Sequence, residues 1–451
     1  MAGTPRPQTV STKQQRIAEL AEQMPDVVLT SVSHHIDVGW LEEAVRRTRR
    51  DGATGVDGQT AEEYAKDLEG NLQSLLNRAK SGQYRAPPVR RVHIPKGTGE
   101  SRPLGIPTYE DKVLQRAVVM ALEPIYEQDF MPFSFGFRPG RSAHQAIEQL
   151  RNGLMEMGGG WVVEVDIRGF FDALDHAQLR EILHKRISDG VVLRLIGKWL
   201  NAGVLEDGRV ERPETGSPQG GVISPLLANI YLHEVFDAWW VAAVQPRVRG
   251  RSLAVRYADD IVLAFNSKED ALRVLDVLHK RFARYGLTLH PDKTRLVPFR
   301  RPPRDSRDDD LPPGRRPGSF DFLGFTHYWG RSRRGKRVIR QKTAAKRLSR
   351  SARVIWQWCK RHRHWPLAEQ QARLNRQLRG HYAYFGVTGN IRSLEQLYRH
   401  SQRSWHRWLS RRSQRGYITW SSFQQLLRRH PLARPRVVHS VMPALASEAA
   451  M

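Results

Sequence analysis

Three aspartates lie in sequence contexts where a carboxylate is unusual and could hold metal. Asp166 ends the apolar segment WVVEVDI (161–167), which predicts a strand. Asp259 and Asp260 lie between the two apolar runs of LAVRYADDIVLAF (253–265), which predict a β-hairpin. A carboxylate beside a strand core is costly to bury unless it is paired or binds a cation. Two such sites on neighbouring strands can converge into hard oxygen ligands for Mg²⁺, and two ions about 3.5–4 Å apart can activate a hydroxyl and stabilise a leaving pyrophosphate.

Each of these aspartates also has a structural interpretation. Asp166 could cap the end of its strand, and Asp259 with Asp260 could form a plain turn, because Asp is common in turns. The occurrence of both contexts in one chain, 93 residues apart, favours a shared site. Asp172 and Asp175 favour structural roles, since Asp175 precedes the predicted helix HAQLREIL and is placed to cap it.

The positive charge of the chain is concentrated toward its C-terminal end. The 451 residues include 73 Lys and Arg against 46 Asp and Glu, a net charge of +27. Residues 331–451 hold 28 basic and 3 acidic residues, a net charge of +25, whereas the preceding residues are near neutral at +2. This distribution indicates a polyanion-binding module attached to a near-neutral body. The alternative is a soluble protein with a basic tail that binds nonspecifically, but the sequence of this region is not of low complexity.

The composition excludes several classes of protein. Hydrophobic residues make up 40% of the chain, which is too apolar for a wholly disordered protein. We expect no secretory signal and no transmembrane helix, because no apolar run of about 18 residues occurs. The single cysteine, Cys359, excludes an intrachain disulfide and any zinc site with several cysteines, and it fits a reducing, cytoplasmic setting.

Hydrophobic periodicity predicts a helical start, a mixed middle and a helical end. Helices are expected in the first two parts at 13–24, 39–50, 61–80, 110–130, 141–157, 177–186, 190–202 and 268–286. The segment 217–236 is expected to open with a turn and to continue as a long apolar helix. Further short strands are expected at 89–94, 294–298 and 320–325. The segment 300–319 is rich in proline and charge and predicts a linker. Basic helices interleaved with aromatic residues are expected at 341–363, 366–386, 391–413 and 420–430.

Between roughly residues 40 and 430 the chain resembles reverse transcriptases, most closely those encoded by bacterial group II introns. Six blocks occur in the family's order: FRPGRSAHQAI (137–147), the Asp166 segment, SPQGGVISPLLANIYL (217–232), Tyr257-Ala258-Asp259-Asp260, GLTLHPDKT (286–294) and FDFLGF (320–325). The resemblance implies an α+β fold shaped as a right hand, with a small antiparallel sheet in its palm. The implied parts are an N-terminal extension (1–60), fingers (61–160), palm (161–330), a basic helical thumb or maturase domain (331–430) and a short tail (431–451).

The resemblance also implies roles for single residues. Asp166, Asp259 and Asp260 would be catalytic and, with Ile167, would hold two Mg²⁺ ions, for which Mn²⁺ could substitute. The incoming nucleotide would meet Lys96, Arg102, Phe171, Gln219 and Lys293. RNA would be contacted by residues that include Arg138, Arg141, Arg376 and Arg379.

Some of these roles have competing interpretations in the sequence. Lys96 and Arg102 flank a glycine-rich turn, where cations can close over a triphosphate, but the same turn could be a solvated hairpin tip. Phe171 would be the aromatic gate that excludes a 2′-hydroxyl. Phe170 competes for that role, and either ring could belong to the core.

The implied activity is RNA-directed DNA synthesis, with assistance to group II intron splicing and mobility. The expected partners are template and intron RNA, a DNA primer or target and dNTPs, with no membrane. The oligomeric state is open, and a dimer is one option. Because 21 residues follow residue 430 and Cys359 is alone, we expect no C-terminal endonuclease. A non-catalytic splicing factor and a domesticated relative in phage defence or DNA repair remain alternatives, and the three aspartates argue against the first.

Overall fold

The computed structural model describes residues 9–95, 101–206, 209–211, 216, 220–303, 317–332, 334–413 and 416–440. The chain forms two compact units: unit 1 contains residues 1–146, 165–263 and 269–295, and unit 2 contains residues 147–164, 264–268 and 296–451. Helices combine with small, largely antiparallel sheets, which confirms the predicted mixture. None of the helices in the described ranges is long and apolar enough to span a membrane.

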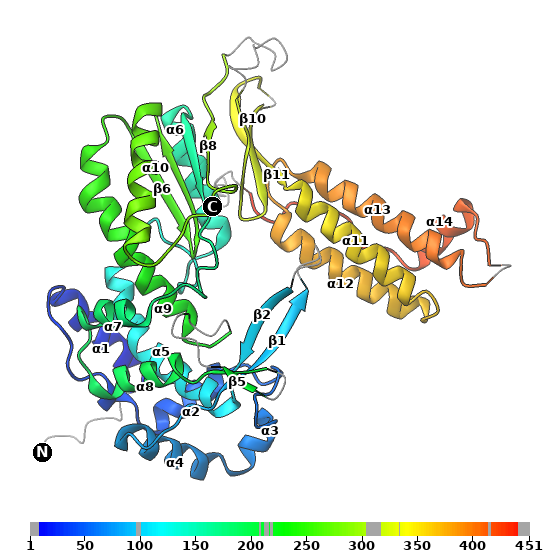
Figure 1. Ribbon diagram of the computed structural model, residues 1–451. Coiled ribbons are helices and arrows are strands. Elements are labelled where there is room, and N and C mark those ends of the chain that lie inside the picture. The colour runs from blue at the N-terminus through cyan, green and yellow to red at the C-terminus, as the bar shows by residue number, and fades with distance from the viewer. Residues whose placement is uncertain are drawn as a thin grey trace, which may run out of the picture. The chain divides into compact units, whose positions relative to one another are not determined.

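The N-terminal helices of unit 1 follow the predicted amphipathic segments. They are α1 (Val10–Gln23), α2 (Val38–Arg47), α3 (Ala61–Tyr64), α4 (Leu68–Ser81) and α5 (Tyr109–Asp129), with 3-10 turns η1 (Ser33–His35) and η2 (Ala65–Asp67) (Figure 1). Helices α1 and α2 both pack against the largely buried α5. The fully buried Trp40 donates its indole N–H to the Ala117 carbonyl oxygen at 2.9 Å, so α2 is fixed to α5 by apolar contact and by a hydrogen bond.

The later helices of unit 1 precede and follow the predicted aspartate segments in the sequence. They are α7 (His176–His184), α8 (Gly190–Leu200) and α9 (Ser224–Leu232), followed by π-helical η3 (His233–Asp237) and η4 (Trp240–Val244), 3-10 turn η5 (Gln245–Arg247) and α10 (Lys268–Ala283). As predicted, Asp175 caps α7, and its carboxylate accepts the Gln178 amide N–H at 2.8 Å. The segment 217–236 continues as a helix after its opening turn residues, as predicted; the helix begins at Ser224, and Pro225 suits its first turn.

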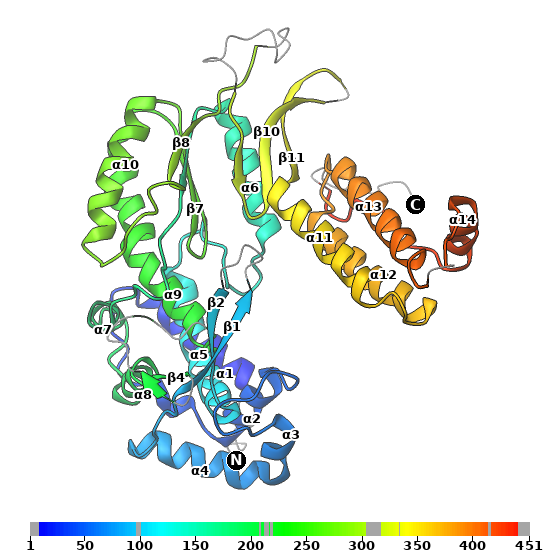
Figure 2. The same ribbon diagram turned by 45° about the vertical axis from the view of Figure 1, so that its right-hand side comes forward.

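Two four-stranded sheets contain most of the strands up to residue 298. The first has the order β2-β1-β4-β5, built from β1 (Val89–Pro95), β2 (Ser101–Ile106), β4 (Val204–Glu206) and β5 (Arg209–Glu211). The second has the order β6-β7-β3-β8, built from β6 (Ser252–Tyr257), β7 (Asp260–Phe265), β3 (Trp161–Val165) and β8 (Arg295–Pro298). Figure 2 shows α10 alongside β7. The hairpin 253–265 and the strands at 89–94 and 294–298 are confirmed, whereas the short β2, β4 and β5 were not predicted.

Unit 2 contains α6 (Ala143–Met157) from residue 147 onward and a sheet of order β11-β10-β9. Its strands are β9 (Phe320–Phe322), β10 (Phe325–Arg331) and β11 (Arg337–Thr343). The prediction of one strand at 320–325 was wrong, because Leu323 (φ 48°) and Gly324 (φ 82°) form a two-residue turn that reverses the chain. The helix predicted from residue 341 begins only at Ala345, since burial alternates along β11.

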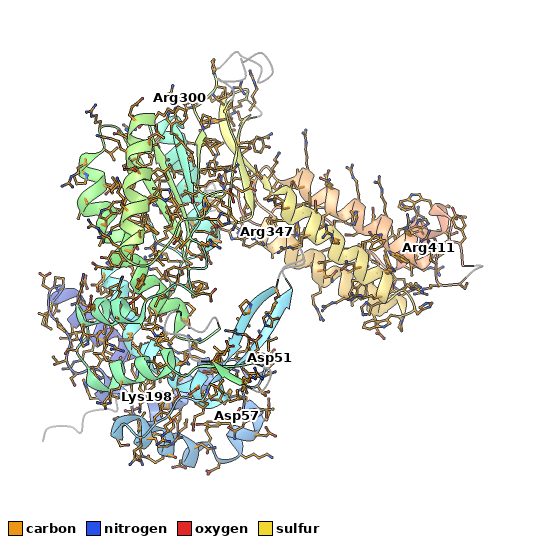
Figure 3. The ribbon with its side chains drawn as sticks, in the orientation of Figure 1. Asp51, Asp57, Lys198, Arg300, Arg347 and Arg411 are labelled. Carbon is orange, nitrogen blue, oxygen red and sulfur yellow. The ribbon has the colours of Figure 1, made fainter. Side chains whose placement is uncertain are left out.

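The basic C-terminal helices form a bundle with an apolar core. They are α11 (Ala345–Arg361), α12 (Leu367–Phe385), α13 (Ile391–Leu409) and α14 (Trp420–Arg429), and α11, α12 and α13 lie side by side in both ribbon views (Figures 1 and 2). Trp405 is fully buried in this core and donates its indole N–H to Gln370 Oε1 at 2.8 Å. The exposed cations of the bundle include Arg347 and Arg411, which Figure 3 labels. The core of the bundle therefore contains aromatic and aliphatic side chains, and many arginines lie at exposed positions.

Candidate active site

The order of the strands brings Asp166 and Asp259 to the same edge of one sheet. Strand β3 adjoins β7, and at one end of this pair Gly160 lies so close to the Phe265 carbonyl oxygen that a Cβ would not fit. Gly160 precedes β3 and Phe265 ends β7, so the two strands are antiparallel. Asp166 directly follows β3 and Asp259 directly precedes β7, so both residues lie at the same edge of this strand pair. The two sequence contexts therefore converge, as predicted, and all three aspartates belong to unit 1.

The turn that carries Asp259 has a strained backbone. Ala258 is the first of two residues between β6 and β7, and its φ of 55° lies in the left-handed region that favours glycine. Holding a side chain there costs about 1–3 kcal/mol, and such conformations persist only where the surroundings impose them. Gly136 supplies one constraint, because its Cα packs directly on the Ala258 amide, where a Cβ would clash.

A buried arginine supplies the second constraint on this turn. Arg256 has no exposed surface, and its guanidinium forms an ion pair with Asp237 at 2.5 Å. Its Nη1 also donates to the Asn229 side-chain oxygen at 2.9 Å and to the Ala258 carbonyl oxygen at 3.2 Å. Asn229 in turn donates to the Gly136 carbonyl oxygen at 2.6 Å. These residues form one closed polar network under the Asp259 turn.

This network was not predicted from the sequence. The only signal for it is a charged residue, Arg256, inside an otherwise apolar strand. Its partner Asp237 ends the π-helical segment η3, and π-helical turns are often found at functional sites. Burial alone would raise the pKa of the Asp237 carboxyl, but the charge of the adjacent Arg256 outweighs burial and holds that pKa below its usual value.

Asp166 is fixed by the segment that contains Lys293. The Asp166 carbonyl oxygen accepts the His290 amide N–H at 2.7 Å, and its carboxylate Oδ2 accepts Lys293 Nζ at 3.1 Å. The Asp166 side chain is 34% exposed and that of Lys293 is 61% exposed, so both can be reached from solvent. Ile167 is buried and bridges Leu289, and because its side chain is apolar, only its backbone carbonyl could ligate a metal.

The donor chemistry at this site fits a hard divalent cation. Asp166, Asp259 and Asp260 supply carboxylate oxygens, which Mg²⁺ prefers. Within the described ranges, no three His, Cys, Asp or Glu side chains are yet gathered closely enough to hold a metal ion. The three carboxylates lie at the same edge of the sheet, and their side chains would have to turn toward a common ion to bind it.

Two adjacent aromatic residues follow Asp166 and differ in burial. Phe170 is 2% exposed and packs against Tyr231, whereas Phe171 is only partly buried. The rings contact each other at 5.3 Å between centroids. Phe170 is therefore a core residue, and Phe171 is the ring of the two that a ligand could reach.

The predicted nucleotide contacts on loops are described only in part. Lys96 and Gln219 lie outside the described residues, and for Arg102 only the backbone, paired with Ile94 across the β1–β2 hairpin, is described. The segments beside them still converge, because Gly220 packs on the Gly105 backbone and Gly216 packs on the backbone of Phe171. The close contact with β2 gives the glycine at position 220 a structural reason, because a Cβ there would clash with the Gly105 carbonyl oxygen.

The four predicted RNA contacts differ in exposure. Arg138 is 7% exposed, pairs with Glu127 at 2.9 Å and donates to the carbonyl oxygens of Met131 and Ser134. Its guanidinium is occupied inside the protein, which argues against the predicted RNA contact. Exposed positions are occupied by Arg141, Arg376 and Arg379.

Comparison with known proteins points to the same region of the chain. Residues 94–327 match the family described as reverse transcriptase (RNA-dependent DNA polymerase). The chain is 39% identical over 289 residues to protein YkfC of Escherichia coli, covering 56% of this chain and 75% of that protein. It is 38% identical over 227 residues to the group II intron-encoded protein LtrA of Lactococcus lactis, covering 49% of this chain but only 37% of LtrA. It is 26% identical over 232 residues to nuclear intron maturase 2 of Arabidopsis thaliana, covering 42% of this chain and 30% of that maturase.

Proposed function

Since this chain belongs to the reverse transcriptase (RNA-dependent DNA polymerase) family, we propose that it copies RNA into DNA by metal-dependent nucleotidyl transfer. The observation that carries this proposal is the antiparallel pair β3 and β7, which brings Asp166 and Asp259 to the same edge of the sheet, with Asp259 on a constrained turn. A binding protein without chemistry would have no use for carboxylates held at the same edge of two strands by a strained backbone. The geometry therefore favours an enzyme over a purely structural RNA chaperone.

Each of the candidate site residues would have its own role in the reaction. Two Mg²⁺ ions, when bound, would activate the primer 3′-hydroxyl and stabilise the charge of the leaving pyrophosphate. Asp166 and Asp259 would hold both ions from adjacent strands, with Asp260 and the Ile167 carbonyl as further donors. Lys293 balances the charge of Asp166 and has enough exposed length to meet a phosphate. Phe171 would face the sugar and exclude a 2′-hydroxyl.

The remaining parts of the chain would position the nucleic acid. In this proposal residues 61–160 form fingers, 161–330 a palm and 331–430 a thumb, with 1–60 as an extension and 431–451 as a tail. Lys96, Arg102 and Gln219 would contact the incoming nucleotide, and the exposed arginines of α11–α14 would contact RNA phosphates. Because relatives carry the names group II intron-encoded protein and intron maturase, we propose assistance to intron splicing as a second role.

Primer extension on an RNA template, with Mg²⁺ and dNTPs, tests the enzymatic role. Asp259→Ala should reduce extension to the background of the assay, because one metal-holding carboxylate is lost. Asp276→Ala is the matched control, since Asp276 is an exposed aspartate on α10 whose partner is Lys280. Wild-type protein without extension activity, or Asp259→Ala with full activity, would reject the polymerase proposal.

A splicing assay with a group II intron RNA separates the two roles. If the aspartates serve only polymerisation, Asp259→Ala should bind the RNA and support splicing as the wild type does. Wild-type protein that extends primers but neither binds nor helps the intron RNA would reject the maturase role. That outcome would favour a relative used in defence or DNA repair.

A further inference from the structure

Phe137 is a large aromatic residue that the fold leaves exposed beside the Asp259 turn. Its side chain is 55% exposed, while its neighbours Phe135 and Arg138 are 3% and 7% exposed. Its φ of 58° lies in the left-handed region, where a non-glycine residue is disfavoured. An exposed ring on an unfavourable backbone contributes little to folding, so folding alone does not explain its position.

The backbone on both sides of Phe137 is firmly held. The Phe135 amide donates to the Arg256 carbonyl oxygen at 2.9 Å, and the Gly136 carbonyl oxygen accepts Asn229 Nδ2 at 2.6 Å. On the other side, the buried Arg138 is fixed by Glu127 at 2.9 Å. The ring of Phe137 is therefore presented by a rigid segment rather than by a loose surface loop.

A second aromatic residue lies next to Phe137. The Tyr257 ring is 6.4 Å from the Phe137 ring between centroids, with 44° between the ring planes. Tyr257 ends β6, two residues before Asp259. The two rings thus form a small aromatic surface that continues directly into the turn holding the aspartates, and both belong to unit 1.

We propose that Phe137 and Tyr257 form a platform for the 3′-terminal nucleotide of the primer strand. Every nucleotide has an apolar base face, and one base packed on an aromatic side chain contributes about 1–3 kcal/mol to binding. The primer end is favoured over the template because the reaction requires a 3′-hydroxyl at Asp259, beside this platform. The choice of strand rests on the proposed function, whereas the aromatic contact with nucleic acid does not.

A fluorescence assay without catalysis tests this contact. The probe is a primer–template duplex with 2-aminopurine at the primer 3′ end or at the first template position beyond it, titrated with protein in EDTA. Wild-type protein should change the emission of the primer probe, and Phe137→Ala should weaken binding by roughly tenfold and remove that change. The slope of affinity against salt should not change, because Phe137 carries no charge.

Matched variants separate stacking from general damage. Phe137→Trp keeps an aromatic face and should retain the emission change, whereas Phe137→Leu keeps apolar bulk and should lose it. Leu272→Ala, at a 48% exposed position on α10, should bind as the wild type does. Phe137→Ala keeps a Cβ on the same backbone, so its melting temperature should stay close to that of the wild type.

The outcomes distinguish this inference from the proposed function. An unchanged affinity in Phe137→Ala, or an emission change confined to the template probe, would overturn the platform. Loss of the primer signal in Phe137→Ala, in a protein that extends no primer, would keep the platform and reject the polymerase. Asp259→Ala should retain the primer signal in EDTA, because its effect is on metal-dependent chemistry.

Discussion

Arg256 and Arg399 both pair with a carboxylate, but their surroundings are opposite. Arg256 and Asp237 are fully buried and lie 2.5 Å apart, under the turn that carries Asp259. Arg399 and Glu395 lie 3.3 Å apart on α13, with side chains 68% and 46% exposed. Removing either partner of a buried pair leaves an unpaired charge in the core and strongly destabilises the fold, whereas an exposed pair contributes little to stability. The sheet region uses charge to fix one geometry, and the helical bundle uses charge to cover a surface.

The same contrast holds for the apolar contacts. The bundle α11–α14 is held by an apolar core that includes Trp405 and Leu378, and many of its arginines lie at exposed positions outside that core. Around the aspartate turn, in contrast, polar groups contact the backbone of Ala258 and Gly136. Ala258 has a positive φ that residues with a side chain normally avoid, and a Cβ at position 136 would clash with the Ala258 amide. Function in the sheet region should therefore depend on a few residues, and function in the bundle on the sum of many.

Breaking the buried pair should have the largest effect. Arg256→Met leaves the Asp237 carboxylate buried and unpaired, so the free energy of unfolding should fall by about 3–5 kcal/mol. Arg399→Met, the exposed counterpart, should change it by less than about 0.5 kcal/mol. Urea unfolding followed by circular dichroism measures both values.

The double variant Arg256→Met with Asp237→Leu separates stability from positioning. Removing both charges should recover most of the lost stability, because no unpaired charge remains in the core. Primer extension should stay reduced, since the Ala258 carbonyl oxygen has lost its donor from Arg256. Full extension activity in a stable double variant would show that the pair serves folding alone.

A second buried carboxyl gives a smaller, pH-dependent effect. Burial raises the pKa of Asp111 to about 8, and this carboxyl accepts the Tyr84 hydroxyl rather than a guanidinium. Below pH 4 it is protonated in the folded and unfolded states; as the pH rises toward 8, the unfolded state releases its proton first and stability falls. Asp111→Asn removes this titration.

Unfolding at two pH values measures this effect. Between about pH 5 and about pH 8, the wild type should lose at least about 1 kcal/mol more stability than Asp111→Asn. Equal losses in both proteins would mean that Asp111 is ionised in the fold. In that case Asp111, which accepts a hydroxyl rather than pairing with a cation, would have the same charge state as Asp237, which is paired with Arg256.

Exposed cations of the bundle should have the smallest effect on the fold and an additive effect on RNA. Arg392, Arg399 and Arg403 line one polar surface of α13. Replacing each by Gln should leave the melting temperature nearly unchanged. It should also make the negative slope of log affinity against log salt less steep, by about 0.7–1 per residue. Filter binding over a range of salt concentrations measures the slope, with Lys280→Gln on α10 as the control. A slope unchanged in the triple variant would exclude this face from RNA binding.

The helices and the catalytic candidates were predictable because their signals are local. Apolar periodicity marks α5 and α11–α14, and an Asp175 before a helix marks a cap. Asp166 and Asp259 were found because carboxylates interrupt strongly apolar runs. Strand β11 was missed because its alternation of basic and apolar residues continues into a basic helix, and the turn at Leu323 was missed because a bulky residue disfavours a positive φ.

The sequence by itself determined which chemistry is available: carboxylates at a strand end and a hairpin turn, and a net charge of +25 in residues 331–451. Only the tertiary structure decided how that chemistry is arranged. Arg138 reads as a surface cation but is buried on Glu127, whereas Arg256 becomes the support of the Asp259 turn. Phe137 is exposed, although large aromatic side chains are usually at least partly buried. The physical reason is that periodicity records which face of an element is apolar, while the partner of a buried charge comes from a distant part of the chain.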